Sequence, residues 1–209
     1  FEAMIIEKYG DDNFHNQARK IRYQFFDEII EKYNAKYLMT AHHGDDLMET
    51  ILMRIVRGST LKGYAGFEKK VEKDNYTLVR PLIFVTKQEL EDFDKEKNIP
   101  YVIDKSNFKG KYTRNRYRKT VLPFLKEEDP NVHNKFLKFS DTLIEYNNYI
   151  DKVLKREINR VYKDNVIDID LFLENDLLIQ KKIIFYIFEH LYQDDLYQIN
   201  MTHVMEVIN

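Results

Sequence analysis

Apolar residues recur along the first part of the chain with the spacing of regular secondary structure. In residues 13–33 they return every three or four positions, which predicts an amphipathic helix. Residues 37–41 predict a short strand, and after the polar run HHGDD helical spacing resumes at Leu47 and stops at Gly58. This order of helix, strand, loop and helix favours an α/β domain with a largely parallel sheet, whose ligands bind at the carboxyl ends of the strands.

The middle of the chain predicts shorter elements. Glycines between positions 58 and 66 predict a loop, whereas residues 77–79 and 82–85 carry strand-like side chains. Thr86 and Glu89 have the spacing of a capping box, which predicts a helix to about Asn98. A further short strand at 101–103 and a polar loop at 104–111 complete this part of the chain.

Beyond Asp129-Pro130 the pattern becomes helical. Apolar spacing predicts one long helix over residues 136–154 and another over 177–192, interrupted only by an alternation of apolar and acidic residues at 166–171. We therefore expect two domains, an α/β part at 1–129 and a helical, substrate-binding part at 130–209.

Composition narrows the class of protein. The 209 residues include no cysteine, which excludes disulfides, thiolate metal sites and chemistry on a protein sulfur. There is no apolar run long enough to span a membrane and no signal peptide, so we expect a soluble, cytoplasmic protein. Thirty-three basic and thirty-five acidic residues nearly cancel, and nucleic-acid binding would need a local basic patch. Phe1 in place of Met indicates that the sequence begins partway through a longer protein.

One candidate site lies where the first predicted strand meets the following helix. Five ionisable residues fall within eight positions there: His42, His43, Asp45, Asp46 and Glu49. A carboxylate at this junction, Asp46 first, suits Mg²⁺ bound with substrate phosphates, while the histidines contact phosphate. Two alternatives remain open: Asp45 as a helix cap, and Glu49 as the partner of Arg54 in a surface ion pair.

A second candidate site is a basic block. Residues 105–126 contain eight basic side chains and no acidic one. Arginine offers a planar fork of donors to phosphate oxygens, and the neighbouring tyrosines offer faces on which a base can stack. The alternative is a solvated helix face. The candidate RNA-binding residues are Lys111, Arg114, Asn115, Arg116 and Arg118, and Arg22 on the first helix is a further candidate.

These motifs resemble those of the tRNA(Ile)-lysidine synthetases, a family of PP-loop ATPases. The resemblance rests on AHHGDDLMET at 41–50, ARKIRYQFF at 18–26, RPL at 80–82, and DKSN at 104–107 leading into RNRYR at 114–118. It implies a reaction in which ATP adenylates C2 of the wobble cytidine of a tRNA(Ile) with a CAU anticodon, and free L-lysine then displaces AMP.

The resemblance also implies roles for the residues. Asp46, His42 and Arg22 would act in catalysis, His43, Asp45 and Glu49 would bind ATP, and Asp46 would bind Mg²⁺. Residues 114–118 would hold phosphates or the anticodon nucleotide, and a homodimer is among the expected assemblies. The family's S-G-G-x-D-S loop is absent from the 209 residues. We therefore expect the chain to be truncated at its N-terminus and inactive on its own.

Three other functions remain open. A non-catalytic RNA-binding module would keep the basic block and use HHGDD only as a structural cap. Another PP-loop enzyme that modifies tRNA would share the first motif, although the thiolating relatives commonly use cysteines. A metal-dependent hydrolase would use both histidines with Asp45 and Asp46, but adjacent histidines in extended backbone point to opposite sides.

Overall fold

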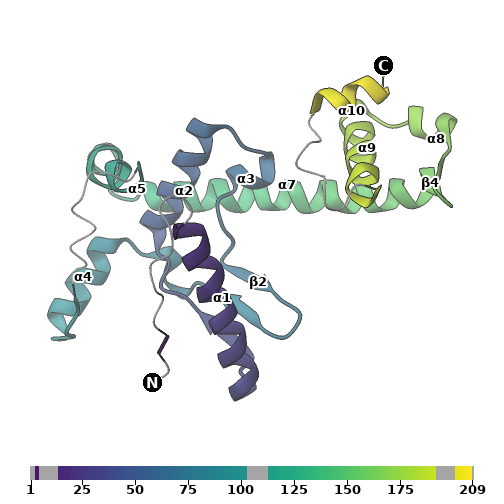
Figure 1. The fold of residues 1–209 in the computed structure, drawn as a ribbon. Helices are drawn as coiled ribbons and strands as arrows, with labels where there is room; N and C mark the ends of the chain where they lie inside the picture. Colours follow the sequence, from purple (N-terminus) through teal and green to yellow (C-terminus); the bar gives the residue numbers. More distant parts are fainter. Residues whose placement is uncertain (1–2, 5–13, 103–112, 192–200, 209) are drawn as a thin grey trace. The chain divides into compact units, whose positions relative to one another are not determined.

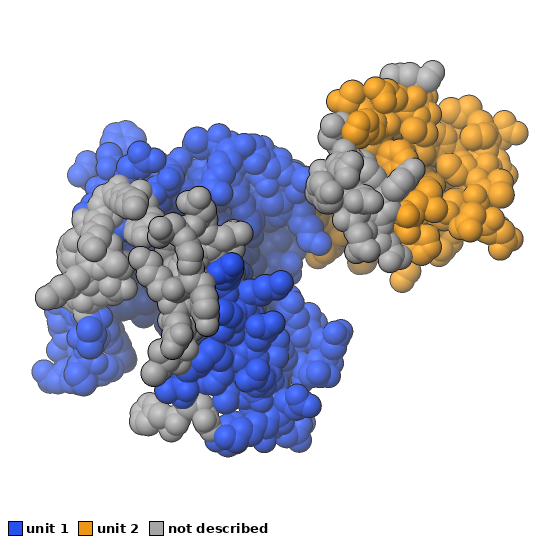
Figure 2. All heavy atoms as spheres, in the orientation of Figure 1, with its two compact units in different colours: residues 1–144 blue, residues 145–209 orange. Residues whose placement is uncertain are grey.

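The computed structural model describes residues 3–4, 14–102, 113–191 and 201–208. The chain divides into two compact units, residues 1–144 and 145–209, which are coloured separately in Figure 2. Because each unit has its own contacts, we describe each one by itself.

The first unit begins with the elements that the hydrophobic pattern predicts. Helix α1 (Phe14–Tyr33) is followed by strand β1 (Tyr37–Met39) and helix α2 (Gly44–Arg57). Helix α2 ends at Gly58, as predicted, and buries Leu47 and Ile51 almost completely. The order helix, strand, loop and helix is thereby confirmed.

A three-stranded sheet has the order β1-β3-β2. Strand β3 (Thr77–Val79) pairs with β1 in parallel and with β2 (Lys70–Glu72) in antiparallel orientation. Figure 1 shows the β2–β3 hairpin alongside α1, and the hydroxyl of Tyr76 in its turn donates a hydrogen bond to Asp27 of α1. The predicted α/β class is confirmed, although the sequence pattern missed β2 and the sheet is therefore mixed.

Two predictions in the middle of this unit are wrong. Residues 82–85 are not a strand, because Pro81 begins a 3₁₀ helix, η1 (Pro81–Phe84). Proline lacks a backbone N–H and has a fixed φ, which suits the first position of a helical turn. The glycine-rich segment, predicted to be a loop, contains the short helix α3 (Leu61–Tyr64), which Thr60 caps through its side-chain oxygen.

The capping-box prediction is confirmed. Helix α4 (Lys87–Glu96) follows Thr86, whose hydroxyl accepts a hydrogen bond from the Glu89 backbone, and the Glu89 carboxylate accepts one from the Thr86 backbone. Residues 101–102 form no strand, and Ile103 and the predicted loop at 104–111 lie outside the described residues.

The basic block leads into a run of helical segments. It passes from α5 (Thr113–Arg116) through a π-helical turn, η3 (Tyr117–Val121), to α6 (Leu122–Glu128). The long predicted helix is α7 (Val132–Val161), and its first turns pack against α2 through Val132 and Leu137. The boundary between the two compact units, at residues 144 and 145, falls inside α7. The functional division proposed at residue 129 stays a prediction.

The second unit is helical around a small hairpin. The end of α7 continues into β4 (Tyr162–Lys163), which pairs with β5 (Val166–Ile167), and α8 (Ile169–Leu173) follows. The predicted helix at 177–192 is α9 (Leu177–Leu191), and α10 (Met201–Ile208) is the last described helix.

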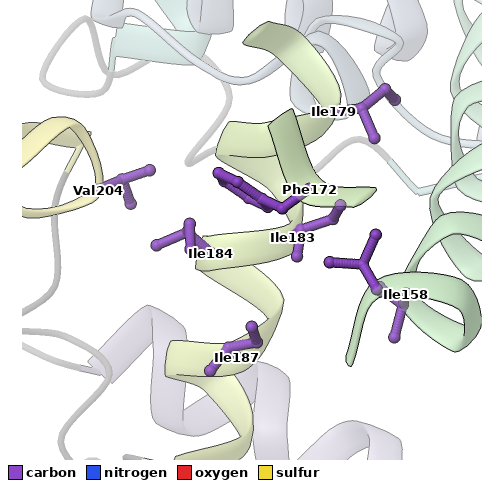
Figure 3. Close-up of a cluster of buried hydrophobic side chains, with 8 residues drawn as sticks. Ile158, Phe172, Ile179, Ile183, Ile184, Ile187 and Val204 are labelled. Carbon is purple, nitrogen blue, oxygen red and sulfur yellow. The ribbon is translucent and has the colours of Figure 1, made fainter. Parts of the chain in front are cut away.

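An isoleucine-rich core fills the second unit. Helix α9 contributes four of the eight buried residues, and the side chains of Phe172 and Val204 gather against it from α8 and α10 (Figure 3). Within the described ranges, every helix is too short or too polar to cross a bilayer.

Candidate active site at the carboxyl ends of the parallel strands

The first predicted site lies where β1 and β3 end side by side. The Thr40 amide, just after β1, donates a hydrogen bond of 3.0 Å to the Val79 carbonyl at the end of β3. Parallel strands end at the same edge of a sheet, so HHGDD from one strand and Arg80 from the other reach the same region. The predicted placement of HHGDD at a carboxyl edge is confirmed.

Gly44 allows the chain to turn closely into α2. Its amide donates a hydrogen bond of 2.8 Å to the Val85 carbonyl. A Cβ atom added at this position would lie 3.1 Å from that carbonyl oxygen and 3.3 Å from the Cβ of His133. Those distances leave little room for a larger residue, and the glycine therefore fixes where the acidic helix begins.

An ionic cluster joins the two predicted sites. Glu49 is completely buried, and its carboxylate accepts hydrogen bonds from Arg114 Nε at 2.5 Å and from Arg118 Nε at 2.7 Å. The Oδ1 atom of Asp46 lies 3.3 Å from a terminal nitrogen of each arginine. Asp46, Glu49, Arg114 and Arg118 are called the ionic cluster below. Hydrogen bonds of this charge-assisted type are stronger than neutral ones.

The contacts of the ionic cluster exclude two of the alternatives considered from the sequence, a surface ion pair for Glu49 and a solvated helix face for Arg118. Arg54, the surface partner considered for Glu49, instead donates hydrogen bonds to the carbonyls of Gly63 and Gly66. Burial acts to lower the pKa of Arg118, but hydrogen bonding and charge attraction from Glu49 outweigh it and raise that pKa above its ordinary value. For Arg118, a solvated helix face is therefore ruled out.

Other residues of the basic block have different surroundings. Asn115 is buried, whereas Arg116 is exposed and bonds to Thr113 in its own helix, as in a solvated face. Lys111 lies outside the described residues. Arg22 is exposed on α1 and makes none of the contacts that define the ionic cluster.

Asp45 connects three helices of the first unit. Its carboxylate accepts a hydrogen bond of 2.7 Å from Lys126 of α6 and one of 3.3 Å from the backbone of Lys87, the first residue of α4. A carboxylate at a helix N-terminus is stabilised by the unpaired N–H groups there. The capping alternative thus has support, with the difference that Asp45 caps α4 instead of its own helix.

His43 is tied to Asp46 within the same turn. Its backbone N–H donates a hydrogen bond of 3.2 Å to Asp46 Oδ2, and its Nε2 atom lies 3.4 Å from that same oxygen. One oxygen of Asp46 therefore faces an imidazole while the other faces two guanidinium groups.

His42 lies among positive charges. Its Nδ1 atom is 2.8 Å from the hydroxyl of Thr40, and its ring packs on Phe67 with 5.2 Å between the centroids. Burial lowers the pKa of His42 most; Asp46 opposes this shift, and Arg80, Arg114 and Arg19 add to it. The net shift favours the neutral form of the imidazole. The sequence pattern did not indicate Phe67, and it gave Arg80 no role, although Arg80 belongs to the RPL motif at 80–82.

The site suits an anion better than an added cation. Both oxygens of Asp46 already face positively charged or imidazole groups, and this arrangement does not fit Mg²⁺ at that carboxylate. No group of three or more histidine and carboxylate side chains in the described ranges could hold a metal ion. Arg114 and Arg118, whose side chains are 43% and 27% exposed, would instead attract phosphate oxygens.

The fold and site define an α/β domain with charged side chains at the carboxyl edge of its parallel strands, and comparison with known proteins identifies its family. A family model described as the PP-loop domain matches residues 3–125, and the chain belongs to this family.

Several curated relatives bear the name tRNA(Ile)-lysidine synthase. The chain is 42% identical to one from a strain of Bacillus cereus over 209 residues, which is 96% of this chain and 44% of the relative. It is 45% identical to the one from Bacillus subtilis over 144 residues, or 69% and 30% of the two chains. It is 38% identical to the one from Geobacillus kaustophilus over 171 residues, which is 80% of this chain and 37% of the relative. The chain thus spans less than half the length of these relatives.

Proposed function

We propose that this chain is part of an ATP-dependent ligase that attaches L-lysine to C2 of the wobble cytidine of a tRNA(Ile) with a CAU anticodon. The product, lysidine, changes the codon that the tRNA reads from AUG to AUA. The proposal is supported by the names of the relatives, by the PP-loop domain and by the ionic cluster. The ionic cluster is the main support for the proposal, because it brings the acidic motif and the basic block of the resemblance into one site.

The proposed reaction has two steps, adenylation of the cytidine and displacement of AMP by lysine. The cytidine O2 atom attacks the α-phosphorus of ATP, and pyrophosphate leaves. An amine of lysine then attacks C2, the C–O bond breaks with release of AMP, and the amine loses a proton. Both steps place negative charge on phosphate oxygens, so preorganised positive groups accelerate them more than a reactive protein nucleophile would.

The arginines of the cluster supply that preorganised charge. Glu49 holds the guanidinium groups of Arg114 and Arg118, whose side chains remain 43% and 27% exposed. Among the residues that the structure describes, their Nη1 atoms have no hydrogen-bond partner, and these donors can bind a phosphate oxygen or the RNA backbone. Because the partner carboxylate is fully buried, these arginines keep their orientation before substrate arrives.

His42 and Asp46 act at the same edge of the sheet. A neutral His42 donates a hydrogen bond to, or accepts a proton from, a reacting group without adding to the repulsion among the nearby arginines. Asp46 orients Arg114, Arg118 and His43. We assign no Mg²⁺ to Asp46, because one oxygen of this carboxylate faces two guanidinium groups and the other faces the backbone N–H and imidazole of His43.

The decisive experiment compares modification with binding. In the full-length protein, Asp46→Asn should reduce the incorporation of labelled lysine into a tRNA(Ile) transcript by about 100-fold, while filter binding of the transcript changes little. Asp92→Asn on α4, where the carboxylate is exposed and contacts Gln88 and Lys95, is the matched control and should retain activity. A transcript with uridine at the wobble position should take up no lysine.

The rival reading as a non-catalytic RNA-binding module predicts a different result. For such a protein neither transcript would incorporate lysine, and the Asp46→Asn substitution would have no effect to measure. If the unsubstituted protein incorporates lysine and Asp46→Asn does so equally well, the role given to this carboxylate is contradicted. The homodimer remains a prediction, and sedimentation of the purified protein tests it directly.

A further inference from the structure

Five side chains form a continuous series from α1 to His42. The guanidinium carbon of Arg19 lies 4.9 Å from the centroid of the Tyr23 ring. Burial lowers the pKa of Arg80 most, and the neighbouring Tyr23 side chain opposes that shift. The guanidinium carbon of Arg80 lies 5.0 Å from the Phe67 centroid, and the Phe67 ring packs on His42. Arginines and aromatic rings thus alternate in what we call the cation–aromatic series.

Arg80 is the unusual member of this series. Only 7% of its surface is exposed, yet it forms no ion pair with any carboxylate that the structure describes. One terminal nitrogen donates to the Glu68 carbonyl, whereas its Nε atom is buried with no hydrogen-bond partner among the described residues. A buried charge without a carboxylate is costly, and hydrophobic packing alone would be served better by an apolar side chain.

The position of Arg80 suggests what this charge does. Phe67 has Arg80 near one part of its ring and His42 near another, so the location of the guanidinium determines where the ring can lie. His42 is then held twice, by the Phe67 ring and by the Thr40 hydroxyl at Nδ1. These two contacts define the plane of the imidazole and leave Nε2 as the nitrogen available for a substrate.

We propose that Arg80 and Phe67 are positioning residues that hold the His42 imidazole with Nε2 directed to a reacting phosphate group. This inference rests on the proposed function, because it assumes that His42 acts in the modification reaction. It adds two residues that act through His42. A planar guanidinium lies on an aromatic ring while it donates in its own plane, which the compact ammonium of lysine does not do.

The test is a double-mutant cycle in the full-length protein. With tRNA(Ile) transcript, ATP and labelled lysine, Arg80→Lys and Phe67→Leu should each reduce the rate of lysine incorporation by about 10- to 100-fold. In a His42→Gln background the same two substitutions should have much smaller effects, about 2-fold or less, because the group that they position is already gone. Phe67→Leu keeps an apolar side chain at this position and serves if Arg80→Lys does not fold.

A spectroscopic measurement separates positioning from general loss of structure. In protein labelled at histidine, Arg80→Lys and Phe67→Leu should move the ring resonances of His42, assigned by their absence in His42→Gln. Arg54→Lys is the matched control, because Arg54 also donates to backbone carbonyls, although it is only half-buried, and it lies outside the series. That control should leave the His42 resonances in place.

Each outcome separates the inference from the proposed function. Equal losses in the presence and absence of the His42 side chain would overturn the inference and leave the proposed function standing, as would unmoved His42 resonances. Full activity of His42→Gln would overturn the inference together with the role of His42. No lysine incorporation by the unsubstituted protein would refute the proposed function itself.

Discussion

Glu49→Gln should destabilise the protein far more than an ordinary loss of a surface charge. The substitution keeps the shape of a side chain that is completely buried, but removes the charge that faces Arg114 at 2.5 Å and Arg118 at 2.7 and 3.2 Å. Its amide group would also direct N–H donors at guanidinium donors. The two arginines would be left beside the core without their principal partner.

The expected magnitude follows from the exposure of the partners. Breaking a fully buried ion pair costs about 3 to 5 kcal/mol. Arg114 and Arg118 have side chains 43% and 27% exposed, so water compensates part of the loss, and glutamine still accepts one hydrogen bond. We therefore expect the free energy of unfolding to fall by about 2 to 3 kcal/mol.

Urea denaturation followed by circular dichroism measures this loss. The matched control is Glu91→Gln on α4, where the carboxylate pairs with Lys87 at the surface one turn away and the expected change is below about 0.5 kcal/mol. Equal shifts of the denaturation midpoint for the two variants would refute the reasoning, because Glu49 would then not hold α2 to the basic block.

Three further predictions concern stability. Thr86→Ala removes the hydroxyl that accepts from the Glu89 backbone and should lower the free energy of unfolding by about 1 kcal/mol, measured by urea denaturation. Gly66→Ala should cost about 1 to 3 kcal/mol, because Gly66 has a φ of +78° and a new Cβ would lie 2.7 Å from Leu47 Cδ1; a rise in melting temperature would contradict this. Burial lowers the pKa of His42 below its ordinary value of 6.5, so the unfolded chain takes up the proton first and stability should decline as the pH falls below about 6.5. His42→Gln should flatten that part of the stability curve, and an identical curve would show that His42 does not cause the decline.

The sequence pattern predicted the helices and caps that depend on residues close together in the chain. The spacing of apolar residues gave α1, α2, α7 and α9, and two residues three positions apart gave the cap of α4. Residues 82–85 misled for a physical reason, since four apolar side chains in a row are compatible with a strand, while Pro81 favours a helical turn before them. Strand β2 was missed because Lys70 and Glu72 are exposed and only Val71 between them is apolar.

Contacts between distant segments lay beyond such patterns. HHGDD and the basic block are separate candidate sites in the sequence, and no motif of the resemblance indicates which other motif it contacts. Nothing in the spacing paired Glu49 with arginines 65 and 69 positions away, or directed Asp45 to the start of α4. Neighbouring residues suggested only Arg54 as a partner for Glu49, because the helical period reveals neighbours on one helix and no others.

The burial of Glu49 also bears on the order in which the protein assembles during its synthesis. Glu49 lies in α2 between apolar residues that form the core, yet its partners follow 65 and 69 residues later. At ribosomal rates of about 5 to 20 residues per second, the arginines are made roughly 3 to 14 seconds after the carboxylate. Until they arrive, closing the core would trap an uncompensated charge, and the apolar face of α2 therefore stays in contact with water or a chaperone. The latest-made segment of the site thus sets the time at which the nascent α/β core can close.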